Sequence, residues 1–167
     1  ATVGTKGGKV NFGRPFTARP SAMKVDYKYT CGAITHNEGG PSNDTTPHAV
    51  GDPDRCHIYI ALGDWDYKTF GGTSESPVQV NTTDVSTLFN PNNDAVIAYG
   101  ELVKGESVND WTEEVIRLKY KDTTRRPTHI IISCSSSKLG DYLTGSYNSI
   151  LWVDDFELIY DENVVTE

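Results

Sequence analysis

The chain has 167 residues and a formal net charge of −8, with 10% aromatic and 23% charged residues. This length fits one domain that buries a core without metal or disulfide staples, and the composition excludes a disordered chain. No apolar run reaches the ~20 residues that a membrane-spanning helix needs. The acidic balance also opposes a nucleic-acid partner, because phosphate binding requires clustered Lys and Arg. We therefore expect one domain over residues 1–167, with about residues 1–9 as a flexible or linker segment.

Alternation of apolar and polar residues with a period of two predicts most elements of the chain. The expected strands cover residues 10–12, 23–31, 55–62, 95–102, 111–120, 128–133 and 149–160. The last two are more continuously apolar, which is typical of central strands. Only residues 83–89 suggest a helical turn, with Thr83 or Asp84 as its cap. This order predicts an all-β fold, a two-sheet jelly-roll-like β-sandwich, mostly antiparallel, with at most one or two short helical turns.

The three cysteines have no metal-ligand spacing. Cys134 lies in an apolar run and is expected to be a buried, inert thiol. Cys31 and Cys56 lie at the ends of expected strands and would form a disulfide if those strands were neighbours. The odd count argues against a disulfide framework.

Candidate catalytic groups are sparse. Glycoside hydrolysis needs two carboxylates that flank the scissile bond. The adjacent acidic pairs at residues 113–114 and 154–155 lie in strands, where successive side chains point to opposite faces. A pair would have to come from distant positions, such as Asp64 or Asp66 with Asp141. The sequence therefore leans against an enzyme.

Side chains suited to saccharide binding gather directly after the strand at residues 55–62. Asp64, Trp65, Asp66, Tyr67 and Phe70 interleave carboxylates with aromatic rings. Aromatic faces stack on sugar rings, and carboxylates accept hydrogen bonds from hydroxyl groups. We expect a ligand-binding platform here, with the alternative that Trp65 only closes the core at a sandwich edge.

A second candidate binding segment covers residues 135–142. Lys138, Asp141 and Tyr142 offer a cation, a carboxylate and an aromatic ring after three serines. The alternative is an ordinary loop whose serines bond to their own backbone. Trp152 lies in the final apolar strand between Leu151 and Val153, and core packing is the favoured interpretation for it.

Asp154 and Asp155 stand inside that same apolar strand. Consecutive aspartates in such a place are costly unless they are paired, hydrogen-bonded or bound to a cation. A structural calcium ion is one solution, because calcium prefers hard oxygen ligands. The favoured alternative is a cap, in which a carboxylate accepts hydrogen bonds from backbone N–H groups of a nearby loop.

Several motifs in the same order resemble the "putative carbohydrate metabolism domain" of surface proteins from Bacteroides and related bacteria. The matching stretches are residues 10–16, 19–20, 27–29, 96–100, 126–128, 135–141 and 151–156, with Trp111, Gly145 and Ser149. They read VNFGRPF, RP, YKY, VIAYG, RPT, SSSKLGD and LWVDDF. The resemblance therefore covers nearly the whole chain from Val10 onward.

This resemblance implies a jelly roll similar to carbohydrate-binding modules, at the C-terminal end of larger lipoproteins on the bacterial outer-membrane surface. It also implies an excised or processed fragment. Many carbohydrate-binding sandwiches end in a similar strand, and in some of them an aspartate holds a structural calcium ion, as Asp154 or Asp155 would here.

Three functions remain open on the sequence. The first is recognition of an oligo- or polysaccharide, without nucleic acid and without membrane insertion by this chain. The second is a structural or adhesive sandwich that pairs with other surface proteins along an exposed edge. The third is a glycoside hydrolase, which requires two carboxylates facing one cleft.

Overall fold

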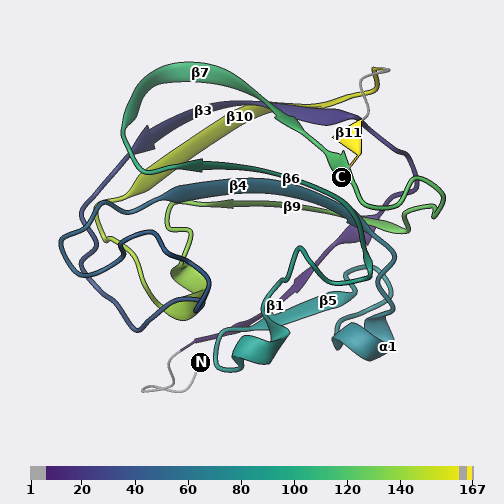
Figure 1. The fold of residues 1–167 in the computed structure, drawn as a ribbon, viewed down its shortest axis with the longest axis horizontal. Helices are drawn as coiled ribbons and strands as arrows, with labels where there is room; N and C mark the ends of the chain where they lie inside the picture. Colours follow the sequence, from purple (N-terminus) through teal and green to yellow (C-terminus); the bar gives the residue numbers. More distant parts are fainter. Residues whose placement is uncertain (1–6, 162–164, 167) are drawn as a thin grey trace.

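Two β-sheets lie face to face, and a small two-stranded ribbon covers part of the outer side of the larger one (Figure 1). The computed structural model describes residues 7–161 and 165–166; residues 1–6 of the expected linker lie outside this part. The three-stranded sheet has the order β10 (Ile150–Ile159), β3 (Ala22–Thr30), β7 (Val108–Arg117). The larger sheet has the order β11 (Val165–Thr166), β8 (Lys119–Tyr120), β6 (Val96–Lys104), β4 (Cys56–Gly63), β9 (His129–Ser135), β2 (Arg14–Pro15). The ribbon pairs β1 (Lys9–Phe12) with β5 (Val78–Asn81). All pairs are antiparallel except β11 with β8, so the predicted β-sandwich is confirmed.

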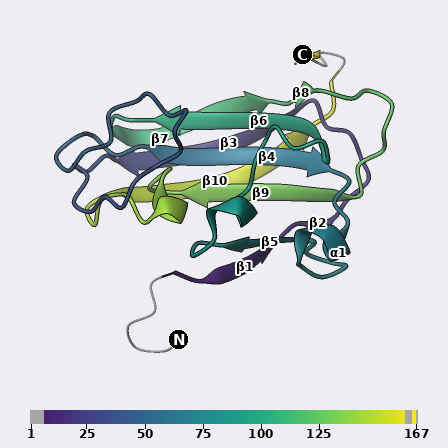
Figure 2. The same cartoon turned by 60° about the horizontal axis from the view of Figure 1, so that its bottom comes forward.

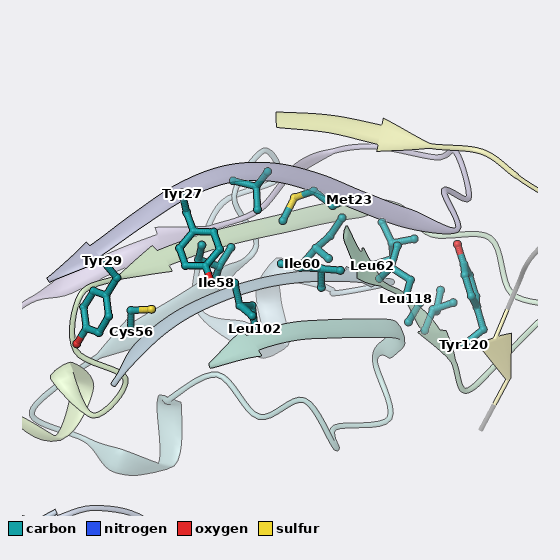
Figure 3. Packing of buried hydrophobic residues seen from close by; sticks show 14 residues of the cluster. Met23, Tyr27, Tyr29, Cys56, Ile58, Ile60, Leu62, Leu102, Leu118 and Tyr120 are labelled. Atoms are coloured by element: carbon teal, nitrogen blue, oxygen red, sulfur yellow. The ribbon is translucent and has the colours of Figure 1, made fainter. Parts of the chain in front are cut away.

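The main core fills the space between the two large sheets, as the period-two pattern predicts. Met23, Val25, Tyr27 and Tyr29 of β3 point into it, and every second residue of β4 meets them from the other side (Figure 3). The side chains of β3 between these residues are less buried. Burying one such aliphatic or aromatic side chain contributes roughly 1.5–3 kcal/mol, so the alternation fixes which face of each strand is inward.

A second apolar cluster lies on the opposite face of the larger sheet. Tyr59, Ala61 and Ile131 pack there with Val78 and Val80 of the ribbon. Figure 2 shows the ribbon of β1 and β5 separate from the two large sheets. The larger sheet is therefore apolar on both faces over part of its area, and its outward-pointing residues are not simply solvated.

Helical structure in the described residues is limited to single turns. They are α1 (Tyr67–Phe70), η1 (Val85–Thr87) and η2 (Gly140–Tyr142). The predicted cap of the second turn is confirmed, because the Asp84 side chain accepts a hydrogen bond from the Ser86 N–H.

Three expectations, about the last strand, Trp152 and Cys134, are corrected by the structure. β10 is an edge strand, not a central one, and Trp152 points away from the core with 40% of its surface exposed. Trp152 pairs with Lys28, which lies on the outer face of β3, so Trp152 faces outward while Leu151 and Val153 pack, partly buried, against the core. Cys134 is exposed, since β9 lies next to the two-residue strand β2 near the sheet edge. Cys31 and Cys56 are free thiols, which agrees with the argument from the odd number of cysteines.

Candidate functional site

A cleft of about 390 Å³ opens on the outer face of the six-stranded sheet. Strands β4 and β6 form its floor, and three loops form its walls. In Figure 1 these loops lie below the larger sheet, on the side opposite β3 and β7. The lining residues are Pro41, Asn43, Asp44, Thr45, His57, Tyr59, Leu88, Phe89, Pro91, Asn92, Tyr99, Glu101, Lys138, Leu139, Asp141 and Tyr142.

The floor follows from the same alternation that builds the core. Ile58 and Ile60 point inward, so His57 and Tyr59 must point outward. The register places Tyr59 of β4 directly opposite Glu101 of β6. Residues directly opposite in a ladder share a face, which brings these side chains into one site.

Aromatic rings form the apolar part of the cleft. Phe89 stacks on Tyr59, with ring centroids 5.0 Å apart and an interplanar angle of 11°. Tyr99 lies 5.8 Å from Tyr59 and 6.2 Å from Phe89, centroid to centroid. Such pairs contribute about 0.5–1.5 kcal/mol each beyond burial, so the aromatic wall is ordered before any ligand arrives.

A hydrogen-bonded group of three side chains stands beside this wall. Glu101 Oε2 lies 2.7 Å from His57 Nε2 and accepts a 3.0 Å hydrogen bond from the Tyr99 hydroxyl. The bond from His57 holds the pKa of Glu101 at about 2, although partial burial opposes the shift. Burial, followed by the nearby Glu101 charge, raises the pKa of Tyr99. Glu101 is therefore an ionised acceptor and Tyr99 a neutral hydroxyl at ordinary pH.

Asp141 and Lys138 lie on the opposite wall, in and beside η2. Withdrawal from water raises the pKa of Asp141, and the neighbouring His57 only partly offsets this effect. The Lys138 charge contributes to the lowered pKa of Glu101. The cleft thus holds two carboxyl groups whose environments shift their pKa values in opposite directions.

The loop that carries Lys138 and Asp141 is anchored by the buried side chain of Asp54. Its Oδ2 accepts hydrogen bonds from the Ser137 hydroxyl (2.6 Å) and the Ser146 N–H (3.0 Å). Its Oδ1 accepts a 2.8 Å bond from the Arg55 N–H. Asp54 is only 3% exposed, so these bonds are shielded from water and fix the loop against the end of β4.

The other wall is held by a buried ion pair. Arg55 Nη2 lies 2.7 Å from Asp44 Oδ2, and only 10% of each side chain is exposed. Burial alone would raise the pKa of Asp44, but hydrogen bonds from Arg55 and Thr46 outweigh it and lower the pKa to about 2. This pair ties the long loop at residues 39–54 to the sheet.

A neighbouring cavity of about 440 Å³ shares Leu88 and Phe89 with the cleft. Trp65 and Phe70 line it together with polar side chains of residues 86–93. The two predicted binding segments therefore reach adjacent hollows that meet at Phe89.

The predicted aromatic platform after β4 is not assembled as an exposed surface. Trp65 is only 4% exposed and lies edge-on to Phe89, with ring centroids 6.4 Å apart, which agrees with the alternative that it closes the core. Asp66 caps α1, and Asp64 lies 3.7 Å from Arg125. Tyr67 is exposed but lines neither hollow. By contrast, the predicted residues Lys138, Asp141 and Tyr142 all line the cleft.

The aspartate pair lies at an irregularity of β10. The register shifts after Asp154, and Asp155 adopts a φ of 50°, so the expected alternation of the two side chains fails there. Asp154 Oδ1 accepts a 2.9 Å hydrogen bond from the N–H of Asp155, the next residue of the strand. Among the described residues no group of three or more His, Cys, Asp or Glu is placed to hold a metal ion. The calcium site stays a prediction that a metal titration can test.

The floor residues His57, Tyr59, Tyr99 and Glu101 were not predicted. The sequence nevertheless contains a sign of this site: bulky aromatic and ionisable residues occupy the outward-facing positions of two strands in which apolar and polar residues alternate. An ordinary solvated face would carry Lys, Thr or Ser at such positions. Only the register between β4 and β6 shows that they meet.

Comparison with known proteins places the chain in a family. The family described as "Putative carbohydrate metabolism domain" matches residues 1–159, so the chain belongs to it. A comparison with curated proteins gives no match. Among the described residues, no helix has the length and apolar character to cross a bilayer.

Two solved structures from Bacteroides share the fold. One, a putative glycoside hydrolase from Bacteroides thetaiotaomicron, is 20% identical with a TM-score of 0.64, over 92% of this chain and 42% of that one. The other, a putative glycoside hydrolase from Bacteroides vulgatus, is 18% identical with a TM-score of 0.63, over 90% of this chain and 56% of that one. The chain thus spans about half the length of these structures.

Proposed function

We propose that the cleft on the outer face of the six-stranded sheet binds a neutral oligo- or polysaccharide. The observation that carries the proposal is the placement of stacked aromatic rings beside an ionised acceptor, a neutral hydroxyl and an ammonium group in one hollow. Sugar rings offer apolar faces to such rings and hydroxyl groups to such acceptors and donors. Membership of a carbohydrate-related family supports the same ligand class.

We infer that this function serves the utilisation of glycans outside the cell, and the resemblance to surface proteins supports this inference. We infer a module of a longer protein at the bacterial outer-membrane surface, where it would hold polysaccharide. This chain spans only part of the matched solved structures, which supports the inference that it is a module of a longer protein.

A glycan array followed by calorimetry tests the proposal. Asp141→Asn keeps the shape of the wall but removes a charged acceptor, and Tyr142→Ala removes a ring. A hydrogen bond to a charged group contributes about 1.5–3 kcal/mol, so Asp141→Asn should weaken binding about tenfold or more. Tyr67→Ala removes an aromatic side chain that is 41% exposed and does not line the cleft, and serves as the matched control. Binding that survives both cleft variants refutes this site.

A second candidate function is glycoside hydrolysis in the same cleft. Glu101 and Asp141 line one hollow, and the pKa of the first is lowered while that of the second is raised. Opposite shifts of this kind are the pattern in which one carboxyl group acts as nucleophile or base and the other as general acid, here Glu101 and Asp141. Release of reducing sugar by the unmodified chain, lost in both Glu101→Gln and Asp141→Asn, supports it. Binding without turnover leaves recognition as the function.

A further inference from the structure

Two exposed tryptophans stand on the face of the three-stranded sheet that points away from the core. Trp111 of β7 is 51% exposed and Trp152 of β10 is 40% exposed. Between them lies β3, whose Lys28 places its Nζ 5.0 Å from the centroid of the Trp111 ring and 5.1 Å from that of Trp152. We call Trp111, Lys28 and Trp152 the tryptophan platform. Exposed large aromatic residues in a cluster mark interaction sites more often than single ones do.

Strand order fixes the spacing of the two indoles. β7 and β10 flank β3, and neighbouring strands lie about 4.8 Å apart, so the two side chains rise from lines roughly 10 Å apart. The two distances to Nζ independently limit the separation of the ring centroids to about 10 Å. A cation over the face of an indole is attracted to it, so Lys28 helps to hold both rings in place without a ligand.

A row of three carboxylates lies beside the tryptophan platform, two residues along β3 from Lys28. Asp26 is directly opposite Glu113 on one side and Asp154 on the other, so the three lie abreast on the face that carries Lys28. Farther along, Lys24 Nζ lies 2.8 Å from Glu157 Oε2 and 3.6 Å from Glu113 Oε2. This row repels a polyanion, whereas its oxygens can accept hydrogen bonds from hydroxyl groups.

We propose that the tryptophan platform is a second saccharide site, which binds neutral, extended chains of β-1,4-linked pyranoses. In such chains every second ring presents the same face, at a repeat close to the spacing of strands β7 and β10, so each indole can stack on one ring. Asp26 and Lys28 lie close enough to meet the hydroxyl groups between them. α-Linked chains curve, so they cannot contact both indole rings of the tryptophan platform at once.

This site is separate from the cleft. It lies on the outer face of the three-stranded sheet, whereas the cleft lies on the outer face of the six-stranded sheet, with the core between them (Figure 1). Two sites on opposite sides of one domain can engage two segments of polysaccharide, and the second contact gains from effective concentration. The proposal extends the saccharide function but rests on residues that the cleft does not use.

Calorimetry with cellohexaose, xylohexaose and chitohexaose tests the platform, with maltohexaose as the α-linked control. We expect saturable binding of at least one β-linked hexamer, weakened about tenfold or more by Trp111→Ala and by Trp152→Ala. Tyr147→Ala, which removes an 84% exposed aromatic ring outside both sites, is the matched control. Lys28→Met keeps the stem but removes the charge, and should weaken binding severalfold without unfolding the sheet.

The tryptophan emission maximum gives a second readout, because it would not shift on adding the hexamer if Trp111 and Trp152 had a purely structural role. Trp65 is buried, so a blue shift on adding the hexamer must come from the two exposed indoles. Loss of binding in the cleft variants with no change in Trp111→Ala and Trp152→Ala overturns the platform and leaves the cleft function standing. Absence of binding by every β-linked hexamer also overturns it. Self-association of the unmodified chain that the tryptophan variants abolish, measured by sedimentation, would show a protein partner instead.

Discussion

Asp54 lies beneath the loop that supplies Lys138 and Asp141, and its replacement offers a sharp test of how the cleft is built. In Asp54→Asn one carboxylate oxygen becomes an NH₂ group, which cannot accept a hydrogen bond. The amide must either turn this group toward the Arg55 N–H or toward the Ser137 hydroxyl and Ser146 N–H. At least one buried donor is left without its acceptor in each orientation.

The size of the effect follows from burial and bond type. Asp54 is 3% exposed, so water does not replace the lost acceptor. A hydrogen bond to a charged group contributes about 1.5–3 kcal/mol, and an unsatisfied buried donor costs about 1–3 kcal/mol. We expect Asp54→Asn to lower the free energy of unfolding by about 2–3 kcal/mol, which for a domain of this size lowers Tm by about 5–10 °C.

Urea unfolding followed by circular dichroism measures this change, with Asp52→Asn as the control in the same loop. Asp52 accepts a hydrogen bond from the Ala49 N–H at an exposed site, so its replacement should cost less than about 1 kcal/mol. Asp54→Asn should also weaken saccharide binding in the cleft more than Asp52→Asn does. Equal midpoints for the two variants would refute the role of Asp54 as the anchor of the loop.

Three further results are expected. The pKa of Glu101 in the folded protein is about 2, below its ordinary value of 4.5, so the interactions of its carboxylate stabilise the fold above pH 4.5 and are lost as the pH falls toward 2. In a plot of Tm against pH, Glu101→Gln should therefore reduce the fall of Tm at acidic pH. An unchanged fall would contradict this assignment. Cys134 is exposed and Cys56 is buried, and reduced solvation of the sulfur raises the pKa of each thiol to about 11. A thiol reagent should therefore label Cys134 slowly at neutral pH and Cys56 only after unfolding. Equal labelling rates in the native state would contradict the packing. In Gly100→Ala the new methyl group would collide with the Arg117 carbonyl oxygen, a backbone atom. We therefore expect urea unfolding to show a loss of about 1–3 kcal/mol in the free energy of unfolding. No loss would show that β7 shifts freely.

Much of the fold was determined by local pattern. The alternation from Met23 to Tyr29 fixes the inward face of β3 whatever surrounds it, because a slip by one residue would expose the whole apolar set. The cap at Asp84 is likewise local, since its acceptor and the Ser86 N–H are two residues apart. The segment with Lys138, Asp141 and Tyr142 was singled out from composition alone, and all three line the cleft.

Only the tertiary structure decided which outward-pointing residues are covered and which meet. Trp65 is buried because Phe89, from a distant loop, packs against it, whereas Trp152 is exposed because it points from β10 to the outer face of the three-stranded sheet. His57, Tyr59, Tyr99 and Glu101 become one site through the register of β4 and β6, which sequence periodicity does not specify. Periodicity states which way a side chain points, but strand order and loop docking decide what it encounters there.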